Sequence, residues 1–201
     1  MPNWKDYLEK IKSFFKWIIF RTDPLSYVAF FIFIYIVYNF IFTPLAIAIT
    51  GSQTPILVIL TPSMQHNHFN LEWYCEWWNL SYEKCEKVWN SLPFPNGINV
   101  GDIVISVSPR DAKVGDVLVM KTSALPYPLV HRVIGLQCGN ETIKEFVELR
   151  KYPNCRLITK GDNNPIPDPY VIYYNQTLGK VAFVIPYLGL PRVLIYKLLH
   201  V

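Results

Sequence analysis

The stretch Ile56-Leu57-Val58-Ile59-Leu60-Thr61-Pro62-Ser63-Met64 decides how this chain is organised. Five apolar residues in a row, Ile56 to Leu60, predict a buried β-strand, and the Thr-Pro pair that follows ends it. Ser63 is therefore expected at the partly exposed end of a strand, where a side chain is held in a defined place. Such a position suits a nucleophile, although a serine after a strand is by itself more often a turn residue.

An uncharged segment precedes this strand. Residues 27–50 contain no Asp, Glu, Lys or Arg, and as a helix they are long enough to cross a hydrocarbon core about 30 Å thick. We therefore predict a transmembrane helix over residues 23–50. A cleaved signal peptide would have a shorter apolar region and a shorter basic lead with fewer acidic residues.

The first 22 residues have a different character. Between Trp4 and Phe20, apolar residues recur at about helical spacing with four lysines among them, which predicts a basic amphipathic helix on a membrane surface. After the span, no Lys or Arg follows until Lys84. The positive-inside rule therefore predicts a cytoplasmic segment over residues 1–22 and an extracytoplasmic domain over residues 51–201, in a single-pass protein of the cell membrane.

All four cysteines lie beyond the span, on the side where disulfides persist. They fall into two sequence-near pairs, so we predict the bonds Cys75–Cys85 and Cys138–Cys155. The first bond would staple an insertion over residues 71–98 that is rich in tryptophan and glutamate. We expect a flap whose aromatic side chains either pack on one another or contact the membrane interface.

Three Asn-X-Ser/Thr sequons lie in the domain predicted to be exported, at Asn79, Asn140 and Asn175. They are candidate glycosylation sites, because that modification occurs on exported domains. The net charge is only +4, and no dense basic cluster lies outside the N-terminal segment, so nucleic-acid binding is not expected. His66 and His68 have no third ligand nearby in the sequence, so they are interpreted as loop residues and no metal site is expected.

From Asn99 onward the sequence predicts short strands separated by turns. Strands are expected over residues 103–107, 117–120, 129–135, 146–149 and 156–159. Short strands at such close spacing indicate a mainly β domain. After residue 181 the apolar sequence is broken by proline and glycine, which predicts a last strand followed by a short membrane-interface helix over residues 191–201.

A serine attacks an amide efficiently only when a base takes its proton, and an imidazole held by a carboxylate does this best. His131 lies within a predicted strand of the exported domain, whereas His200 is terminal. Two aspartates flank a proline-stiffened turn and are the candidate carboxylates, Asp162 and Asp168. Each of them could instead be an ordinary turn-capping residue.

These residues belong to a series of motifs that runs through most of the exported domain. The motifs are Pro62-Ser63-Met64, Gly101-Asp102-Ile103-Val104, Val114-Gly115-Asp116-Val117, Val130-His131-Arg132-Val133, Thr159-Lys160-Gly161-Asp162-Asn163-Asn164 and Ile185-Pro186-Tyr187-Leu188-Gly189. In this order they resemble the type I signal peptidases of the archaeal and eukaryotic endoplasmic-reticulum class. The resemblance implies a β-rich catalytic domain behind an N-terminal transmembrane helix, and a serine endopeptidase without a cofactor that removes signal peptides from translocated preproteins.

The resemblance also implies a role for each candidate residue. Ser63 would be the nucleophile and His131 the general base and then the general acid. Asp168 would be the carboxylate partner of His131, and Asp162 would be a supporting acid that shapes the site. Bacterial relatives have a lysine where this chain has His131, so the chain resembles the Ser/His/Asp class.

By the same resemblance, the hydroxyl of Thr61 and the backbone N–H of Ser63 would stabilise the oxyanion. Ile59 and Met64 are the candidate substrate-binding residues, in shallow apolar pockets that select small side chains. The implied partners are signal-peptide-bearing preproteins, the lipid bilayer and the protein-translocation machinery. A sheet edge near the membrane could take the extended cleavage segment as an added strand.

Two alternatives stay open. In the first, Lys113 or Lys121 replaces His131 as the base, which requires a desolvated lysine. In the second, the chain is a catalytically silent membrane-tethered β module that binds exported peptides or partner proteins. Only the joint presence of Ser63, His131 and Asp168 separates the enzyme from the silent module.

Overall fold

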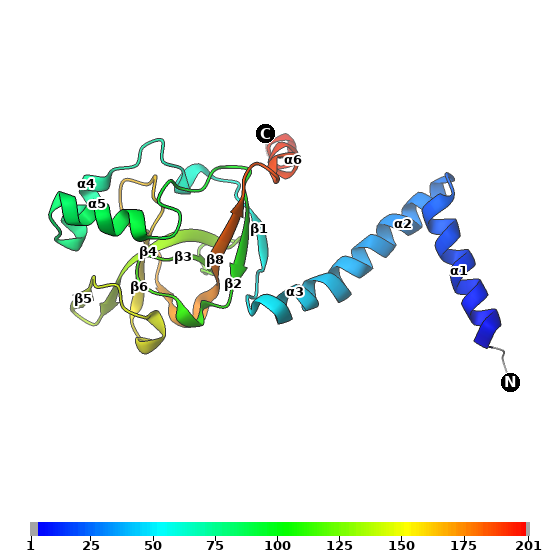
Figure 1. Ribbon diagram of the computed structural model, residues 1–201, viewed down its shortest axis with the longest axis horizontal. Coiled ribbons are helices and arrows are strands. Elements are labelled where there is room, and N and C mark those ends of the chain that lie inside the picture. The colour runs from blue at the N-terminus through cyan, green and yellow to red at the C-terminus, as the bar shows by residue number, and fades with distance from the viewer. Residues whose placement is uncertain (1–3, 200–201) are drawn as a thin grey trace. The chain divides into compact units, whose positions relative to one another are not determined.

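The computed structural model describes residues 4–199. The outer ends of the predicted segments 1–22 and 191–201, with His200, therefore lie outside the described residues. The chain divides between Ala48 and Ile49 into two compact units (Figure 1), an N-terminal helical unit and a β-rich unit. The predicted fold class, a mainly β domain preceded by an apolar N-terminal helix, is confirmed.

The N-terminal unit begins with α1, Trp4–Phe20, and continues in α2, Pro24–Val37. Asp23 caps α2 by accepting a hydrogen bond from the backbone N–H of Ser26 at 3.0 Å, which satisfies one of the free donors of the first helical turn. The rings of Phe15 and Phe33 pack at 5.3 Å between their centroids, so the two helices contact each other within this unit.

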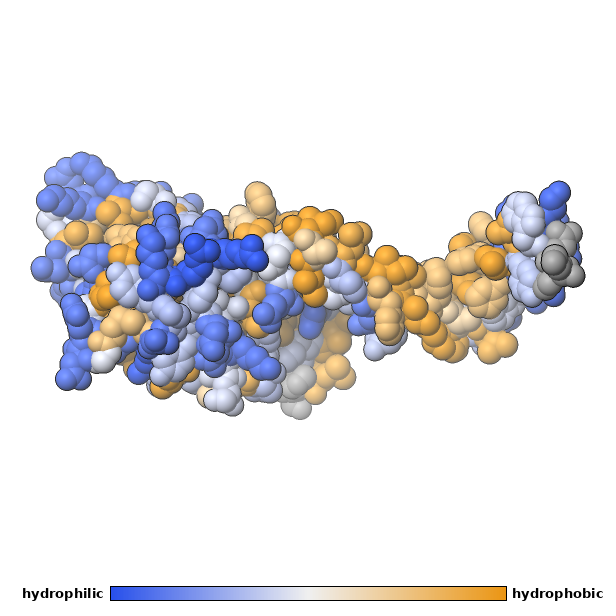
Figure 2. Space-filling model, turned by 90° about the horizontal axis from the view of Figure 1, so that it is seen from below, coloured by the Kyte–Doolittle hydropathy of each residue, from blue (hydrophilic) through white to orange (hydrophobic). Residues whose placement is uncertain are grey.

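A π-helical turn, Tyr38–Phe42, joins α2 to α3, Thr43–Thr50. This turn lies just before Pro44, whose missing N–H interrupts the α-helical hydrogen-bond pattern. The continuous helix Pro24–Thr50 is long and apolar enough to cross a membrane, by length and composition. Figure 2 shows its surface covered by apolar side chains.

The β-rich unit contains a single antiparallel sheet with the strand order β1-β2-β8-β3-β4-β6-β7, and β5 pairs with β4 (Figure 1). The strands are β1 Ile56–Val58, β2 Ile103–Val107, β3 Val117–Met120, β4 Leu129–Cys138, β5 Glu141–Ile143, β6 Arg156–Lys160, β7 Ile172–Tyr173 and β8 Thr177–Ile185. The helix α6, Leu190–Leu199, follows β8, as expected for the segment after the last strand.

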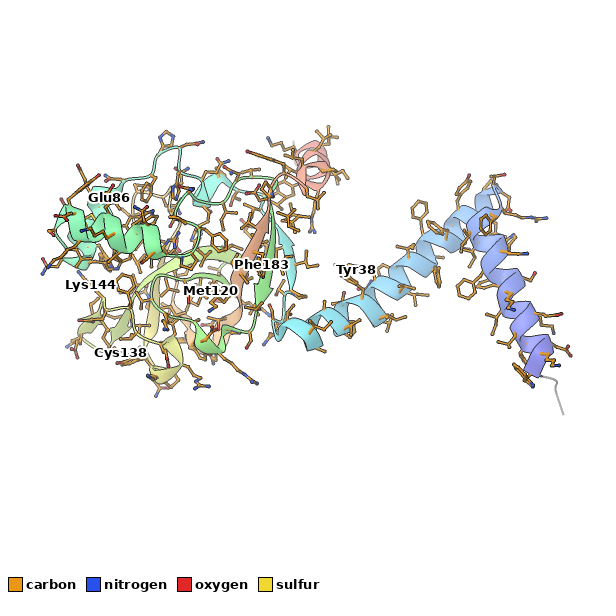
Figure 3. All side chains as sticks on the ribbon, viewed as in Figure 1. Tyr38, Glu86, Met120, Cys138, Lys144 and Phe183 are labelled. Atoms are coloured by element: carbon orange, nitrogen blue, oxygen red, sulfur yellow. A yellow bond between two sulfur atoms is a disulfide. The ribbon has the colours of Figure 1, made fainter. Side chains whose placement is uncertain are left out.

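Both faces of the sheet are buried at its centre. Because side chains alternate along a strand, Leu118 and Met120 of β3 join one core cluster while Val117 and Val119 join another. All four side chains are fully buried, and Figure 3 shows Met120 among the packed side chains of the sheet. Strand β3 therefore contributes side chains to two of the three core clusters.

The insertion over residues 71–98 forms two helices that were not predicted, α4 Leu71–Trp78 and α5 Tyr82–Ser91. Their disulfide, Cys75–Cys85, and the disulfide Cys138–Cys155 are both bonded as predicted. Glu86 lies on the exposed side of α5 (Figure 3), which is the ordinary place for the charged residues of an amphipathic helix.

The aromatic side chains of the insertion pack on one another and also on the sheet. The pairing of β4 with β6 shifts register between Val133 and Gly135, so Ile134 is the extra residue of a bulge. The indole N–H groups of Trp77 and Trp78 both donate to the carbonyl oxygen of Ile134, at 2.9 and 3.0 Å. The insertion is thus attached to the sheet where the ladder is interrupted.

One predicted strand is wrong. Residues 146–149 contain no strand, and this region has only the isolated bridge between Lys113 and Glu148 and the 3-10 turn Leu149–Lys151. The apolar side chain of Leu149 is buried in the core. An apolar run can be buried in this way without pairing with another strand. The short strands β5 and β7 were missed because two or three residues carry no readable alternation.

Candidate active site

Ser63 lies in the 3-10 turn Pro62–Met64 that follows β1. Its neighbour Met64 is buried in the core, with 1% of its surface exposed, and the carbonyl oxygen of Met64 accepts the backbone N–H of Ile98 at 2.8 Å. The carbonyl oxygen of Ser63 accepts the backbone N–H of Asn163 at 2.9 Å. These bonds hold the backbone while the Ser63 side chain stays partly exposed.

His131 comes from β4 and lies opposite Leu118 of β3. Its Nε2 atom is 2.9 Å from Oγ of Ser63, and its Nδ1 atom is 2.6 Å from Oδ2 of Asp168. A neutral ring with its proton on Nδ1 can donate to Asp168 and accept the Ser63 hydroxyl proton at Nε2. The side chains of Ser63, His131 and Asp168 thus form a hydrogen-bonded series.

Asp168 is oriented by β6 as well as by His131. The hydroxyl of Thr159 donates to the same Oδ2 atom at 2.7 Å, and the backbone N–H of Asp168 donates to the carbonyl oxygen of Thr159 at 2.7 Å. The carboxylate is therefore held on both its side chain and its backbone. Of the two candidate carboxylates, Asp168 is the one that contacts the imidazole.

Asp162 lies in a separate buried cluster. It accepts two hydrogen bonds from Arg132, Nε to Oδ1 at 2.9 Å and Nη2 to Oδ2 at 2.7 Å. Tyr74 donates to Oδ1 at 3.1 Å, and Nε2 of His66 is 3.2 Å from Oδ2. Burial alone would raise the pKa of Asp162, but the Arg132 charge and the hydrogen bonds from His66 and Arg132 outweigh it and lower the pKa to about 2.

Gly161, next to Asp162 in the chain, packs against Ser63 and His131. A Cβ atom at this position would lie 2.6 Å from the carbonyl oxygen of Ser63 and 2.9 Å from Nε2 of His131, so only a glycine fits. Next to it, Nδ2 of Asn163 donates to the carbonyl oxygen of Pro62 at 3.1 Å. The loop of residues 161–163 is therefore packed directly against the Ser63 turn.

The candidate oxyanion donor Thr61 lies beside the candidate nucleophile, with its Oγ1 atom 3.3 Å from Oγ of Ser63. Both candidate substrate-binding residues, Ile59 and Met64, line a cleft of about 620 Å³ that also reaches Ser63 and His131. The other lining residues are Thr54, Ile56, Leu57, Val58, Leu60, Thr61, Leu125, Tyr127, Pro128, Leu129, Val130, Tyr170, Arg192 and Tyr196.

The lysines of the dyad alternative are placed unfavourably. Lys113 and Lys121 are both exposed, so neither is desolvated as a neutral base must be. His66 binds Asp162, and among the described residues no group of three His, Cys, Asp or Glu side chains could hold a metal ion. The three sequon asparagines are exposed.

Three buried polar residues near the site were not singled out from the sequence, Tyr74, Arg132 and Lys160. Arg132 and Lys160 lie within the motifs that carry the resemblance, so their positions in the sequence could have identified them as candidate site residues. Burial lowers the pKa of Lys160 to about 8, against the opposing charges of Asp162 and Asp168. Its Nζ atom donates to Oη of Tyr74 at 3.3 Å and to the carbonyl oxygen of Gly161 at 3.2 Å.

Comparison with known proteins finds similarity to signal peptidase complex catalytic subunits. The chain is 29% identical over 154 residues to the signal peptidase complex catalytic subunit sec11 of Schizosaccharomyces pombe, covering 71% of this chain and 67% of that protein. The protein of the same name from Aspergillus oryzae is 32% identical over 100 residues, 44% of this chain and 52% of the relative. The one from Plasmodium falciparum is 22% identical over 153 residues, 73% of this chain and 61% of the relative. The chain thus spans about half to two thirds of these relatives, and no protein-family model matches it.

Proposed function

We propose that this chain, a homologue of the signal peptidase catalytic subunits, is a membrane-bound serine endopeptidase that cleaves signal peptides from translocated preproteins. The observation that carries the proposal is the hydrogen-bonded series from Oγ of Ser63 through His131 to Asp168. Such a series can activate a serine for attack on an amide carbonyl.

In the proposed reaction, Nε2 of His131 takes the hydroxyl proton while Oγ of Ser63 attacks the scissile carbonyl carbon. Asp168 keeps the imidazole proton on Nδ1 and stabilises the imidazolium. The hydroxyl of Thr61 and the backbone N–H of Ser63 donate to the developing oxyanion. His131 then protonates the leaving amine, and it activates the water that hydrolyses the acyl-enzyme.

The cleft suits an extended peptide. Among the described strands, β1 lies at the edge of the sheet and is paired with β2 alone, so its other side is open to an added strand. The cleft lies between residues 54–61 and residues 125–131, and a cleavage segment running between them would bring its scissile carbonyl to Ser63. The apolar side chains of Ile59 and Met64 at this wall favour small apolar side chains before the scissile bond.

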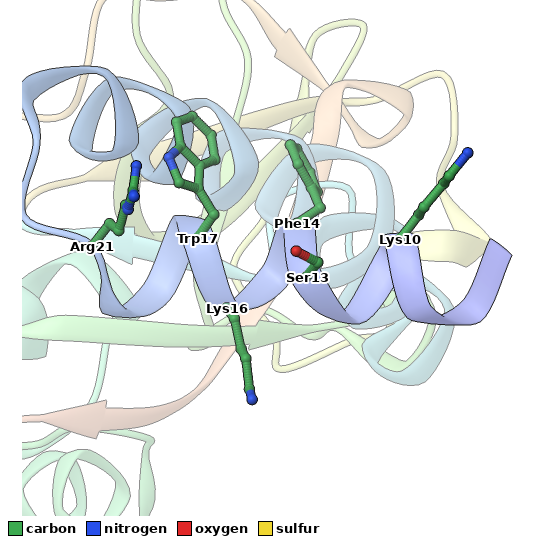
Figure 4. A pocket seen from close by; sticks show the side chains of 6 residues that line it. All are labelled: Lys10, Ser13, Phe14, Lys16, Trp17 and Arg21. Carbon is green, nitrogen blue, oxygen red and sulfur yellow. The ribbon is translucent and has the colours of Figure 1, made fainter. Parts of the chain in front are cut away.

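An apolar helix and a basic, aromatic surface on α1 support attachment to the membrane. Helix Pro24–Thr50 would be the single anchor, with a cytoplasmic N-terminal segment and an extracytoplasmic catalytic domain. A hollow along α1 is lined by three basic residues, Lys10, Lys16 and Arg21, by Phe14 and Trp17, and by Ser13 (Figure 4), which suits a lipid headgroup layer. Anchoring keeps enzyme and substrate on one surface and raises their effective concentration.

A second apolar surface lies on the catalytic domain. On α6 the side chains of Leu194, Ile195 and Leu198 are 57–69% exposed, and at the end of β8 Phe183 is 66% exposed. We assign α6 to the membrane interface, because exposed apolar residues of this number are costly in water. The proposed partners are preproteins, lipid, the protein-translocation machinery and the other subunits of a signal peptidase complex. Asn79, Asn140 and Asn175 are the proposed glycosylation sites.

Cleavage of a model preprotein in detergent micelles tests the function. The intact chain should cut, and Ser63→Ala and His131→Ala should each lose on the order of 10⁴-fold in rate. Ser91→Ala, at an exposed serine of α5, is the matched control. A serine-directed acylating reagent should label the intact chain and not Ser63→Ala. An intact chain that neither cuts nor labels would contradict the enzyme assignment and favour the silent binding module.

A further inference from the structure

The insertion, residues 71–98, reaches into the buried cluster around Asp162. Tyr74 of α4 is fully buried and donates to Oδ1 of Asp162 at 3.1 Å. At the other end of the insertion, the carbonyl oxygens of Pro93 and Phe94 accept Nη1 and Nη2 of Arg132 at 2.9 and 3.2 Å. The insertion therefore contacts both members of the Arg132–Asp162 ion pair.

The phenol of Tyr74 stays protonated and donates a hydrogen bond to Asp162. Burial, with the nearby charge of Asp162, raises the pKa of Tyr74 well above its ordinary value, so the hydroxyl keeps its proton. Nζ of Lys160 donates to the phenol oxygen at 3.3 Å. The phenol thus accepts from Lys160 and donates to Asp162, and both of its hydrogen-bonding directions are used.

Asp162 is flanked in the chain by residues that contact Ser63 and His131. It follows Gly161, whose backbone packs against Ser63 and His131, and it precedes Asn163, which donates to the carbonyl oxygens of Ser63 and Pro62. Its ion-pair partner, Arg132, is the residue next to His131. A displacement of the Asp162 carboxylate would therefore move the supports of both reacting groups.

We propose that Tyr74 is a positioning residue for the Ser63–His131 pair and acts through Asp162. The insertion is then part of the active-site support, and its disulfide keeps α4, and with it Tyr74, in place. This inference rests on the proposed function. The competing interpretation is that Tyr74 only fills the core.

Tyr74→Phe tests the inference, because it keeps the ring and removes only the hydroxyl. The matched control is Tyr174→Phe, which removes a hydroxyl that donates to the carbonyl oxygen of Pro109 at 3.2 Å in the core cluster on β3, β4 and β6. In preprotein cleavage by the full chain in micelles, we expect Tyr74→Phe to lower kcat about tenfold with KM unchanged, since small misplacements cost rate. The rate of acylation by the serine-directed reagent should fall by the same factor.

Tyr174→Phe also removes a hydrogen bond of the domain core, but it should leave kcat and the acylation rate unchanged. Equal kcat values for the two variants would overturn the inference and leave Tyr74 with a packing role. Failure of the proposed function is distinguishable, because then either the intact chain would neither cut nor label or Ser63→Ala would still cut, whatever Tyr74→Phe does.

A double-mutant cycle tests the route through Asp162. If Tyr74 acts through that carboxylate, adding Tyr74→Phe to Asp162→Asn should lower kcat no further. Independent, multiplicative losses would contradict this route. Should Asp162→Asn fail to fold, His66→Leu replaces it, because it removes another contact to the same carboxylate. The loss in the double variant should then differ from the product of the two single losses.

Discussion

Nε2 of His131 lies 2.9 Å from Oγ of Ser63 although 68 residues separate the two in the sequence. His131 is held within the long strand β4, and Ser63 is held by a short turn between β1 and the insertion. Because a strand side chain has little freedom to turn, the alignment of these two atoms depends on how the Ser63 turn is supported. The loop of residues 161–163 supplies that support.

Asp168→Asn should lower kcat for preprotein cleavage by roughly 10³–10⁴-fold, because an amide no longer keeps the His131 proton on Nδ1. Stability should change little, since the asparagine oxygen can still accept from Thr159. Steady-state cleavage and thermal unfolding would measure the two effects. Asp111→Asn, at an aspartate paired with Lys180 on the surface, is the control and should cut normally. Normal cleavage by Asp168→Asn would remove this carboxylate from the mechanism.

Gly161→Ala should abolish most of the activity, because the added Cβ would lie 2.6 Å from the carbonyl oxygen of Ser63 and must displace the turn or the loop. A displacement of this kind costs on the order of 10²-fold in kcat. Gly139→Ala is the control, since that glycine has a positive φ of 60° and open space around its Cβ position. It should lower stability without lowering kcat. Equal activity of the two variants would show that the 161–163 loop tolerates displacement.

Because Lys160 is buried, the free energy of unfolding should increase as the pH rises above about 8. Its pKa is about 8 in the folded chain, below the ordinary lysine value of about 10.4 expected after unfolding. Between these two values the unfolded state binds more protons than the folded state, so the free energy of unfolding rises with pH, by up to about 3 kcal/mol. Denaturant unfolding at pH 7, 8, 9 and 10 in micelles should show this rise for the intact chain and not for Lys160→Met. Parallel curves for the two proteins would contradict the lowered pKa.

The two disulfides should differ in their effect on activity. Replacing Cys75 and Cys85 by serine releases α4 from α5 and should lower kcat, because Tyr74 is next to Cys75. Replacing Cys138 and Cys155, which join the end of β4 to the start of β6, should lower stability by about 2–4 kcal/mol with kcat retained. Preprotein cleavage well below each variant's melting temperature makes the comparison. A larger kcat loss in the Cys138/Cys155 variant would contradict the role given to the insertion.

Most elements of the fold could be predicted from local sequence. The bounds of α1, β2 and β3 agree with the apolar runs that predict them, whereas β6 is one residue longer and β4 three residues longer than predicted. These runs are long enough to show their own period. The helices α4 and α5 could not be read this way. Their many aromatic residues are neutral helix formers, and their positions follow from packing on Ile134 and from the Cys75–Cys85 bond.

The sequence by itself determined the apolar helix, the mainly β domain, the two disulfide pairs and the small set of candidate residues, because these depend on local periodicity, on short loops and on residue types in a motif. Only the tertiary structure decided that Asp168, and not Asp162, contacts His131. Adjacent residues of a strand point to opposite faces, so His131 faces Ser63 and Asp168 while Arg132 faces Asp162 and the insertion. These contacts depend on the register of β4 and on the packing of the loop after β6 against the Ser63 turn. Both are long-range features that cannot be read from neighbouring residues in the sequence.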